Sequence, residues 1–390
     1  MRDVEEALDA WLILLRAPGL GPTAVRALIE RHGGADAALA AARSGDLPAT
    51  LEPSGRAWIK APDAGLLAAD RDWLAGTGHR LLTWDEADFP PLLREIPAAP
   101  AALFVVGDAS RLWLPQIAVV GSRSASQAGI ANARSFARAL AAAGFAITSG
   151  LADGIDGAAH AAALDAGGVT LAVLGTGPDL VYPPKHRELA GRIGAVGVMV
   201  SEFPPGTPGR PQHFPRRNRI IAGLALGTLV VEASLRSGSL ITARCASEQG
   251  REVFAIPGSI HNPLARGCHD LIRNGAKLVE TAEEIIAELR PLAQTLGAHL
   301  RERLAVPETA DTIASRAPPE GAAPGRDADY VRLLAALGHD PLGVDQLAER
   351  TGLTVPALSS MLLVLELEGE VISSRGGVYA RAVRDNGPIP

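Results

Sequence analysis

The chain has 390 residues, which is enough for two or three domains, and its 47% hydrophobic and 21% charged residues are typical of a folded globular protein. Only 4% of the residues are aromatic, so the hydrophobic cores must be built mainly from Ala, Leu, Val and Ile. The net charge of −6 excludes a uniformly basic nucleic-acid-binding surface but is compatible with a local basic groove.

The cysteine content and the N-terminus narrow the class of protein further. Cys245 and Cys268 cannot form a disulfide framework, and without a Cys-x-x-Cys motif we expect no metal site. The sequence begins with acidic residues instead of an apolar signal-peptide region, and no apolar run is long enough to span a membrane. We therefore expect a cytoplasmic protein without membrane contact.

The first part of the sequence predicts a helical domain at residues 1–85. Two stretches of helical apolar spacing, Val4–Arg16 and Val25–His32, are separated by Pro18-Gly-Leu-Gly-Pro22. This pattern is typical of helix-hairpin-helix or SAM-like domains, whose turn amides can hold a nucleic-acid phosphate. The alternative is an ordinary αα-hairpin, in which the glycines only permit the turn. Short strands at 80–84 and 102–106 are expected to pack on the main sheet.

Residues 86–295 predict an α/β core domain, because apolar runs of strand length alternate with helical patterns. This alternation indicates a Rossmann-like, doubly wound parallel sheet with ligands beyond the carboxyl ends of its strands. The predicted strands are Ile117–Val120, Ala146–Ser149, Val169–Leu174, Gly197–Val200, Thr228–Glu232, Glu252–Ile256 and Lys277–Val279.

The loops at those strand ends share a small and polar character. Gly121-Ser122-Arg123 follows the first strand and precedes a helix, so free helix N–H groups and a guanidinium would meet at one place, as in anion-binding sites. Small residues let a ligand approach the backbone, and hydroxyls add donors to phosphate oxygens. The other loops of this kind begin at Ser149-Gly150, Gly175-Thr176-Gly177, Ser201-Glu202, Glu232-Ala233-Ser234 and Pro257-Gly258-Ser259.

A basic run lies within this acidic chain. Residues 210–219 contain four arginines and one histidine without an acidic residue, and Ile220, Ile221 and Leu224 follow at once. The apolar residues predict that this basic segment is held in place by a buried helix, so it could form a basic rim that binds a polyanion. The alternative is that these arginines are only solvated surface residues.

Candidate catalytic groups give weaker patterns. The sequence has no P-loop motif, and the first turn does not fit Gly-x-Gly-x-x-Gly. Asp153, Asp156 and His160 could form a metal or acid–base set, although an Asp at a helix N-terminus is commonly a cap. Glu232 is either a base in a nucleotide-cleaving enzyme or a polar residue that closes its strand.

The C-terminal part predicts a linker and a small domain. Residues 296–327 are rich in Pro, Ala and Gly, and residues 328–384 show three helical stretches, 330–337, 344–351 and 355–368, followed by a hairpin. Three helices and a two-stranded wing describe a winged helix. Its third helix has almost no basic residues, so a protein contact is an alternative to DNA binding.

Four motifs of the core resemble those of the bacterial DNA-processing protein family DprA, also called Smf. They are Gly121-Ser-Arg123, Ser149-Gly-Leu-Ala-Asp-Gly-Ile-Asp-Gly-Ala-Ala-His160, Phe214-Pro-Arg-Arg-Asn-Arg-Ile-Ile-Ala-Gly223 and Ser237-Gly-Ser-Leu-Ile-Thr-Ala243. The resemblance implies a non-enzymatic protein without a cofactor that binds single-stranded DNA, protects it and loads the RecA recombinase in natural transformation. It also implies a homodimer formed through the core domain.

The resemblance assigns the site residues one by one, with Arg123 as the main phosphate clamp. Few exposed aromatic residues are expected near the pocket, and Phe214 and Tyr182 are the candidates for base stacking. The expected DNA-binding residues are Gly121, Ser122, Arg123, Ser149, Gly150, Lys185, Arg216, Arg217, Asn218, Arg219, Ser237, Gly238 and Ser239. The alternative function is a Rossmann-like enzyme that hydrolyses nucleoside monophosphates. That group has a Pro-Gly-Gly-x-Gly-Thr loop, and residues 231–238 of this chain stand in its place with a different sequence.

Overall fold

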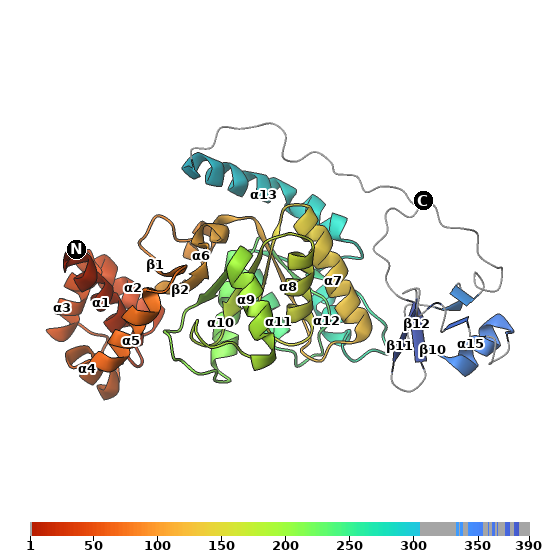
Figure 1. Ribbon diagram of the computed structural model, residues 1–390, viewed down its shortest axis with the longest axis horizontal. Helices are drawn as coiled ribbons and strands as arrows, with labels where there is room; N and C mark the ends of the chain where they lie inside the picture. The colour runs from red at the N-terminus through yellow and green to blue at the C-terminus, as the bar shows by residue number, and fades with distance from the viewer. Residues whose placement is uncertain are drawn as a thin grey trace.

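The computed structural model of the chain describes residues 2–304 and, further on, residues 333–334, 336–337, 342–353, 358, 361–362, 365, 371–374 and 378–381. Within these ranges, a group of N-terminal helices is followed by a nine-stranded sheet with helices on both faces, and a small three-stranded sheet lies near the C-terminus (Figure 1).

The N-terminal unit consists of five short helices whose shared core is rich in Ala and Leu. Its first turn needs glycine, because Gly19 has a φ of +78° and a Cβ at Gly55 would collide with the carbonyl oxygen of Pro18. The two predicted helices and the turn between them are present, and the turn packs against the fourth helix. DNA binding by this turn stays a prediction. The helices are α1 (Arg2–Arg16), α2 (Pro22–His32), α3 (Ala35–Arg43), α4 (Pro53–Lys60) and α5 (Ala64–Leu74).

The large sheet has the strand order β1-β2-β6-β5-β4-β3-β7-β8-β9. All neighbouring pairs from β6 to β9 are parallel, which confirms the predicted doubly wound α/β fold, whereas β2 runs antiparallel to both β1 and β6. The strands are β1 (His79–Thr83), β2 (Ala102–Gly107), β3 (Gln116–Val120), β4 (Ala146–Ser149), β5 (Thr170–Leu174), β6 (Val198–Ser201), β7 (Gly227–Val230), β8 (Glu252–Ala255) and β9 (Lys277–Leu278).

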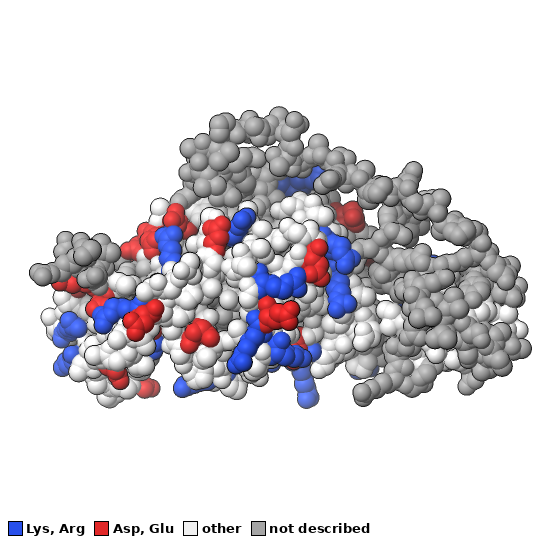
Figure 2. Space-filling model, viewed as in Figure 1, with Lys and Arg blue, Asp and Glu red and all other residues white. Residues whose placement is uncertain are grey.

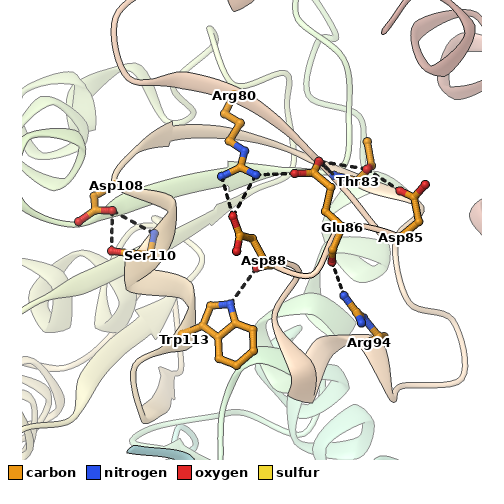
Figure 3. Close-up of polar contacts among 9 residues, drawn as sticks. All are labelled: Arg80, Thr83, Asp85, Glu86, Asp88, Arg94, Asp108, Ser110 and Trp113. Atoms are coloured by element: carbon orange, nitrogen blue, oxygen red, sulfur yellow. Dashed lines mark hydrogen bonds and ion pairs between the residues drawn. The ribbon is translucent and has the colours of Figure 1, made fainter. Parts of the chain in front are cut away.

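The two strands that were expected to pack on the sheet extend it instead. Although β1 falls within residues 1–85, it pairs along its length with β2. The sequence did not predict this pairing, because a five-residue strand without clear alternation does not reveal its partner. Figure 3 shows the polar contacts that hold the turn after β1, where Arg80 forms ion pairs with Glu86 and Asp88 and the Trp113 indole donates to the Asp88 carbonyl at 2.8 Å.

The central strands are buried on both faces, and alternate residues point to opposite helix layers. Ile117 and Val119 of β3 face one layer, and Ala118 and Val120 face the other. The first layer contains α7 (Gln127–Ala142), α8 (Ile155–Asp165), α9 (Arg187–Val196) and α13 (Ala282–Leu304). The second layer contains α6 (Pro91–Arg94), α10 (His213–Leu224), α11 (Ser239–Glu248) and α12 (Arg266–Arg273).

The C-terminal part agrees with a winged helix where it is described. The helix α15 (Val344–Thr351) and the strands β11 (Val371–Ser374) and β12 (Val378–Arg381) match the predicted second helix and wing. A two-residue strand, β10 (Leu342–Gly343), pairs with β12 and is too short to be predicted from its pattern. The helix α13 continues into the expected linker. The rest of that linker and most of the other two predicted helices lie outside the described residues.

Across the described ranges, no helix has the length and apolarity that crossing a membrane would require. The same residues contain no cluster of His, Cys, Asp and Glu that could hold a metal ion.

Candidate functional site

A pocket of about 750 Å³ opens at the carboxyl ends of the strands, where the strand order reverses between β3 and β7. In doubly wound sheets this reversal leaves a crevice, because the loops after the two strands turn to opposite faces. The pocket is lined by Val120, Gly121, Ser122, Arg123, Ser124, Ala152, Asp156, Tyr182, Gly209, Pro211, Phe214, Pro215, Arg217, Asn218, Ile221, Ser234, Ser237, Gly238, Ser239, Ile241, Thr242 and Leu264.

The loop after β3 is tied to the end of β7. The Ser122 amide donates to the Glu232 carbonyl at 2.7 Å, and the Glu232 carboxylate accepts from the Ser126 amide at 2.9 Å and its hydroxyl at 2.6 Å. Gly129 lies so close to this carboxylate that a Cβ would not fit. Glu232 was predicted to be either a catalytic base or a polar residue that closes its strand. The geometry favours the second role, because the carboxylate holds the loop and the residue does not line the pocket.

Arg123 is the exposed cation of the pocket. Its guanidinium carbon lies 5.2 Å from the centre of the Phe214 ring, a cation–π contact, and Tyr182 packs against the same ring at 5.5 Å between centroids. Arg123 has no acidic partner in the part of the chain that the structure describes. It also borders a smaller adjoining pocket of about 70 Å³. An exposed, unneutralised guanidinium beside two aromatic rings is well suited to an aromatic anion such as a nucleotide.

Arg217 supplies a second guanidinium, which is buried. Its Nη1 donates to the Gly150 carbonyl at 2.6 Å and also to the Val173 carbonyl, while its Nε has no partner among the described atoms. Burial lowers the pKa of Arg217 to about 10, so the side chain stays charged at neutral pH. Burial raises the pKa of Asp156, and the nearby charge of Arg217 opposes that rise.

The loop after β4 is folded around Asp156. The Asp156 carboxylate accepts from the Gly150 amide at 3.1 Å and the Ala152 amide at 3.3 Å, both in the loop before α8, whereas the N-cap position of α8 is occupied by Gly154. Ser149 is fully buried and donates to the Val119 carbonyl at 2.6 Å, so it supports the loop from within the sheet and does not line the pocket, contrary to the expectation. Gly150 borders the smaller pocket through its backbone.

The loop before α11 forms the opposite wall. The hydroxyls of Ser237 and Ser239 lie 2.7 Å apart and share a hydrogen bond. The Asn218 amide nitrogen donates to the Gly238 carbonyl at 3.2 Å, which fixes this loop relative to α10. Asn218 and the three loop residues line the pocket, and DNA binding by them stays a prediction.

The predicted basic rim is not continuous. Arg216 and Arg219 are three residues apart and share a face of α10, where both pair with the buried carboxylate of Glu202, the former at 2.9 Å. Lys185 is exposed and pairs with Asp153 at 3.0 Å. None of these three basic residues lines either pocket. Figure 2 likewise shows basic and acidic side chains interspersed on the visible face.

The possible catalytic set of Asp153, Asp156 and His160 does not converge. The His160 Nδ1 lies 2.7 Å from the hydroxyl of Thr170, which donates to the Ile147 carbonyl, so His160 is enclosed beneath the sheet and away from both pockets. The Asp156 carboxylate accepts from two amides of the loop before α8, and Asp153 pairs with Lys185.

Several lining residues were missed by the sequence reasoning. Thr242 lies in the same motif as Ser239, one helical turn further on, so helix periodicity could have identified it. Ser124 follows the Gly-Ser-Arg loop directly. Gly209 and Pro211 precede α10 and carry no polar side chain, so no sequence signal marked them.

These features define a class of protein: a Rossmann-like α/β protein with a pocket lined by two arginines at its topological switch point, extended by an N-terminal helical unit and a C-terminal winged helix. A family model for DNA recombination-mediator protein A matches residues 80–290. Models for the DprA-like N-terminal HHH domain and the DprA winged helix domain match residues 5–69 and 317–377. The chain belongs to the DprA/Smf family.

Individual relatives agree with this assignment. Protein Smf of Escherichia coli strain K12 is 46% identical over 80% of this chain and 80% of its own length. The solved structure of DNA processing protein A from Streptococcus pneumoniae is 39% identical, covers 72% of this chain and 97% of that chain, and has a TM-score of 0.65. A structure of DNA processing protein A from Helicobacter pylori, which describes its single-stranded DNA binding mode, is 26% identical with a TM-score of 0.50 and covers 54% of this chain and 96% of that chain.

The burial of His160 predicts how the stability of the protein depends on pH. Burial lowers the pKa of His160 to about 3, below the ordinary value of 6.5, so between these values the unfolded chain binds a proton that the folded chain does not. The free energy of unfolding should therefore fall by about 1.4 kcal/mol per pH unit from this group as the pH drops below about 6.5. Urea unfolding at pH 7, 6 and 5 should show a shallower dependence for His160→Gln. Equal slopes would contradict a neutral buried imidazole.

Proposed function

We propose that this chain binds single-stranded DNA in the pocket at the switch point and acts in DNA processing during natural transformation. The observation that carries the proposal is Arg123, an exposed and unneutralised guanidinium stacked on Phe214 at a pocket lined by backbone and hydroxyl groups. The single-stranded DNA binding mode described for the relative from Helicobacter pylori supports the same ligand.

The chemistry of the pocket fits a ligand recognised by its backbone. Arg123 and the buried Arg217 provide positive charge, and the Ser237-Gly238-Ser239 loop provides hydroxyls, which together can grip phosphates without reading bases. The Phe214 and Tyr182 rings offer faces for stacking, which is tolerant of base identity. Neutralising about three or four phosphates would make the binding weaken steeply with salt.

Arg123→Ala should reduce the affinity for a single-stranded oligonucleotide about tenfold or more, because a charge-assisted contact to phosphate is lost. The slope of log affinity against log salt should also become shallower by about 0.7. Fluorescence anisotropy at several salt concentrations measures both quantities.

The matched control is Arg192→Ala, which removes one positive charge from an exposed ion pair with Asp165 at 2.6 Å, outside both pockets. It should leave the affinity within about twofold, since an exposed pair contributes little. Equal losses in both variants would show that only the overall charge matters and would remove Arg123 from the site.

We propose that the chain has no catalytic activity on nucleotides. Its buried carboxylates near the pocket, Asp156 and Glu232, are engaged with backbone or side-chain donors. Incubation with a panel of nucleoside monophosphates should release no free base when followed by chromatography. Release that disappears in Asp156→Asn would instead favour the nucleotide-cleaving alternative.

The family assignment also leads us to propose a homodimer formed through the core domain and a role in loading RecA. Two grooves would let one strand run across both subunits and gain from effective concentration. Light scattering should give twice the monomer mass, and the chain should accelerate RecA filament formation on DNA coated with single-strand-binding protein. A monomer that leaves the filament rate unchanged would refute both parts.

A further inference from the structure

One wall of the pocket is formed by a segment that connects β6 to α10, residues 202–212, which we call the strap. It begins at Glu202, which pairs with two arginines of α10, and it brings Gly209 and Pro211 to the pocket. It then leads into the helix that carries Phe214 and Arg217. The position of the strap therefore affects both the wall of the pocket and the start of α10.

The strap is attached to the core on one side. The Gly177 amide donates to the Thr207 carbonyl at 2.8 Å, and the Gly206 amide donates to the Asp179 carboxylate at 2.8 Å. The loop that supplies Gly177 and Asp179 continues to Tyr182, whose ring packs against that of Phe214 at an interplanar angle of 45°. A shift of the strap would therefore be transmitted to the aromatic pair as well.

On its other side the strap meets the N-terminal helical unit. Arg16, the last residue of α1, donates from Nε and Nη2 to the carboxylate of Asp70 at 2.5 and 2.6 Å, and its Nη2 also donates to the Pro205 carbonyl at 2.8 Å. Asp70 is fully buried and Arg16 is 13% exposed on its side chain. The two-pronged contact with Asp70 fixes the plane of the guanidinium and so the direction of the donor to Pro205.

Pro205 presents only an acceptor to this contact. Both Pro204 and Pro205 lack a backbone N–H, so their carbonyls are the hydrogen-bonding groups by which the backbone can be held there. The Pro204 carbonyl already accepts from Thr207, from its amide at 3.2 Å and its hydroxyl at 2.6 Å. Arg16 thus holds the remaining carbonyl of the proline pair.

We infer that Arg16 is a positioning residue for the pocket: through Asp70 and Pro205 it makes the N-terminal helical unit hold the strap in the conformation that receives the ligand. The effect on DNA rests on the function proposed above, whereas the effect on the strap does not. The N-terminal unit thereby contributes to binding without lining the pocket.

The test must remove the contact with Pro205 without leaving a buried charge, because an unpaired Asp70 would cost about 3–5 kcal/mol and could unfold the unit. We therefore choose the double variant Arg16→Met/Asp70→Leu, which replaces the pair by apolar groups, a change that is often neutral for stability. Arg16→Lys is a second variant, since one ammonium keeps the charge beside Asp70 but cannot reproduce the forked contact.

The matched control is Arg26→Met. Arg26 joins the same N-terminal unit to the core at a different place, where it lies 5.3 Å from the Trp84 ring and 3.5 Å from the Pro97 carbonyl, and it does not touch the strap. This control variant distinguishes a change in the position of the strap from a general weakening of the contacts between the N-terminal unit and the core.

Hydrogen exchange of the free, full-length protein should become faster at Gly206 and Thr207 in the double variant and in Arg16→Lys but not in Arg26→Met. Affinity for single-stranded DNA should fall roughly threefold to tenfold in the same two variants, with unfolding temperatures close to that of Arg26→Met. Unchanged exchange in the strap, or an equal effect of Arg26→Met, would overturn the inference. If the unaltered protein binds no DNA, the proposed function fails, and the exchange of the strap still decides the role of Arg16.

Discussion

The burial of Arg217 is the interaction on which the pocket depends. A charged guanidinium inside a protein is costly unless its donors are satisfied, and here two main-chain carbonyls from the ends of β4 and β5 accept from it beside the carboxylate of Asp156. These contacts lock α10 against the carboxyl edge of the sheet. The helix is thereby held in the orientation in which Phe214 lines the pocket and Asn218 donates to the Ser237-Gly238-Ser239 loop.

The same helix shows how an acidic chain can present a local basic site. Of the three arginines in its Arg-Arg-Asn-Arg run, the two on one face are neutralised by Glu202, and the third is the buried Arg217. Lys185 is likewise neutralised by Asp153. Because of this pairing, the unpaired positive charge at the pocket is confined, among the described residues, to Arg123 and the inner Arg217 and does not form a broad basic surface.

The N-terminal unit belongs to the architecture of the site more closely than its sequence suggests. Ala102 and Phe104 of β2 share a hydrophobic core with its helices, and Arg16 reaches the segment before α10. The apolar contact fixes the unit against the edge of the sheet. The hydrogen bond from Arg16 to Pro205 then connects the unit to the segment that leads to the pocket. A module that looks separable in the sequence thereby contacts the segment that brings Gly209 and Pro211 to the pocket.

The sequence by itself determined the strands, the doubly wound sheet and the edge at which the pocket lies, because buried parallel strands read as continuous apolar runs and their carboxyl ends share one edge. It also placed Arg123 at this edge, since Arg123 lies in the loop directly after a strand, whereas Ser237-Gly238-Ser239 was pointed out by its resemblance to a family motif. Only the tertiary structure decided the roles of Arg216, Arg219 and Lys185, because each is set by a carboxylate distant in the sequence or in another loop. The tertiary structure also decided that Ser149 is buried, because the sequence does not show which groups a hydroxyl meets across a sheet. The contact of Arg16 with Pro205 was decided in the same way, because a hydrogen bond between residues 189 positions apart leaves no local pattern.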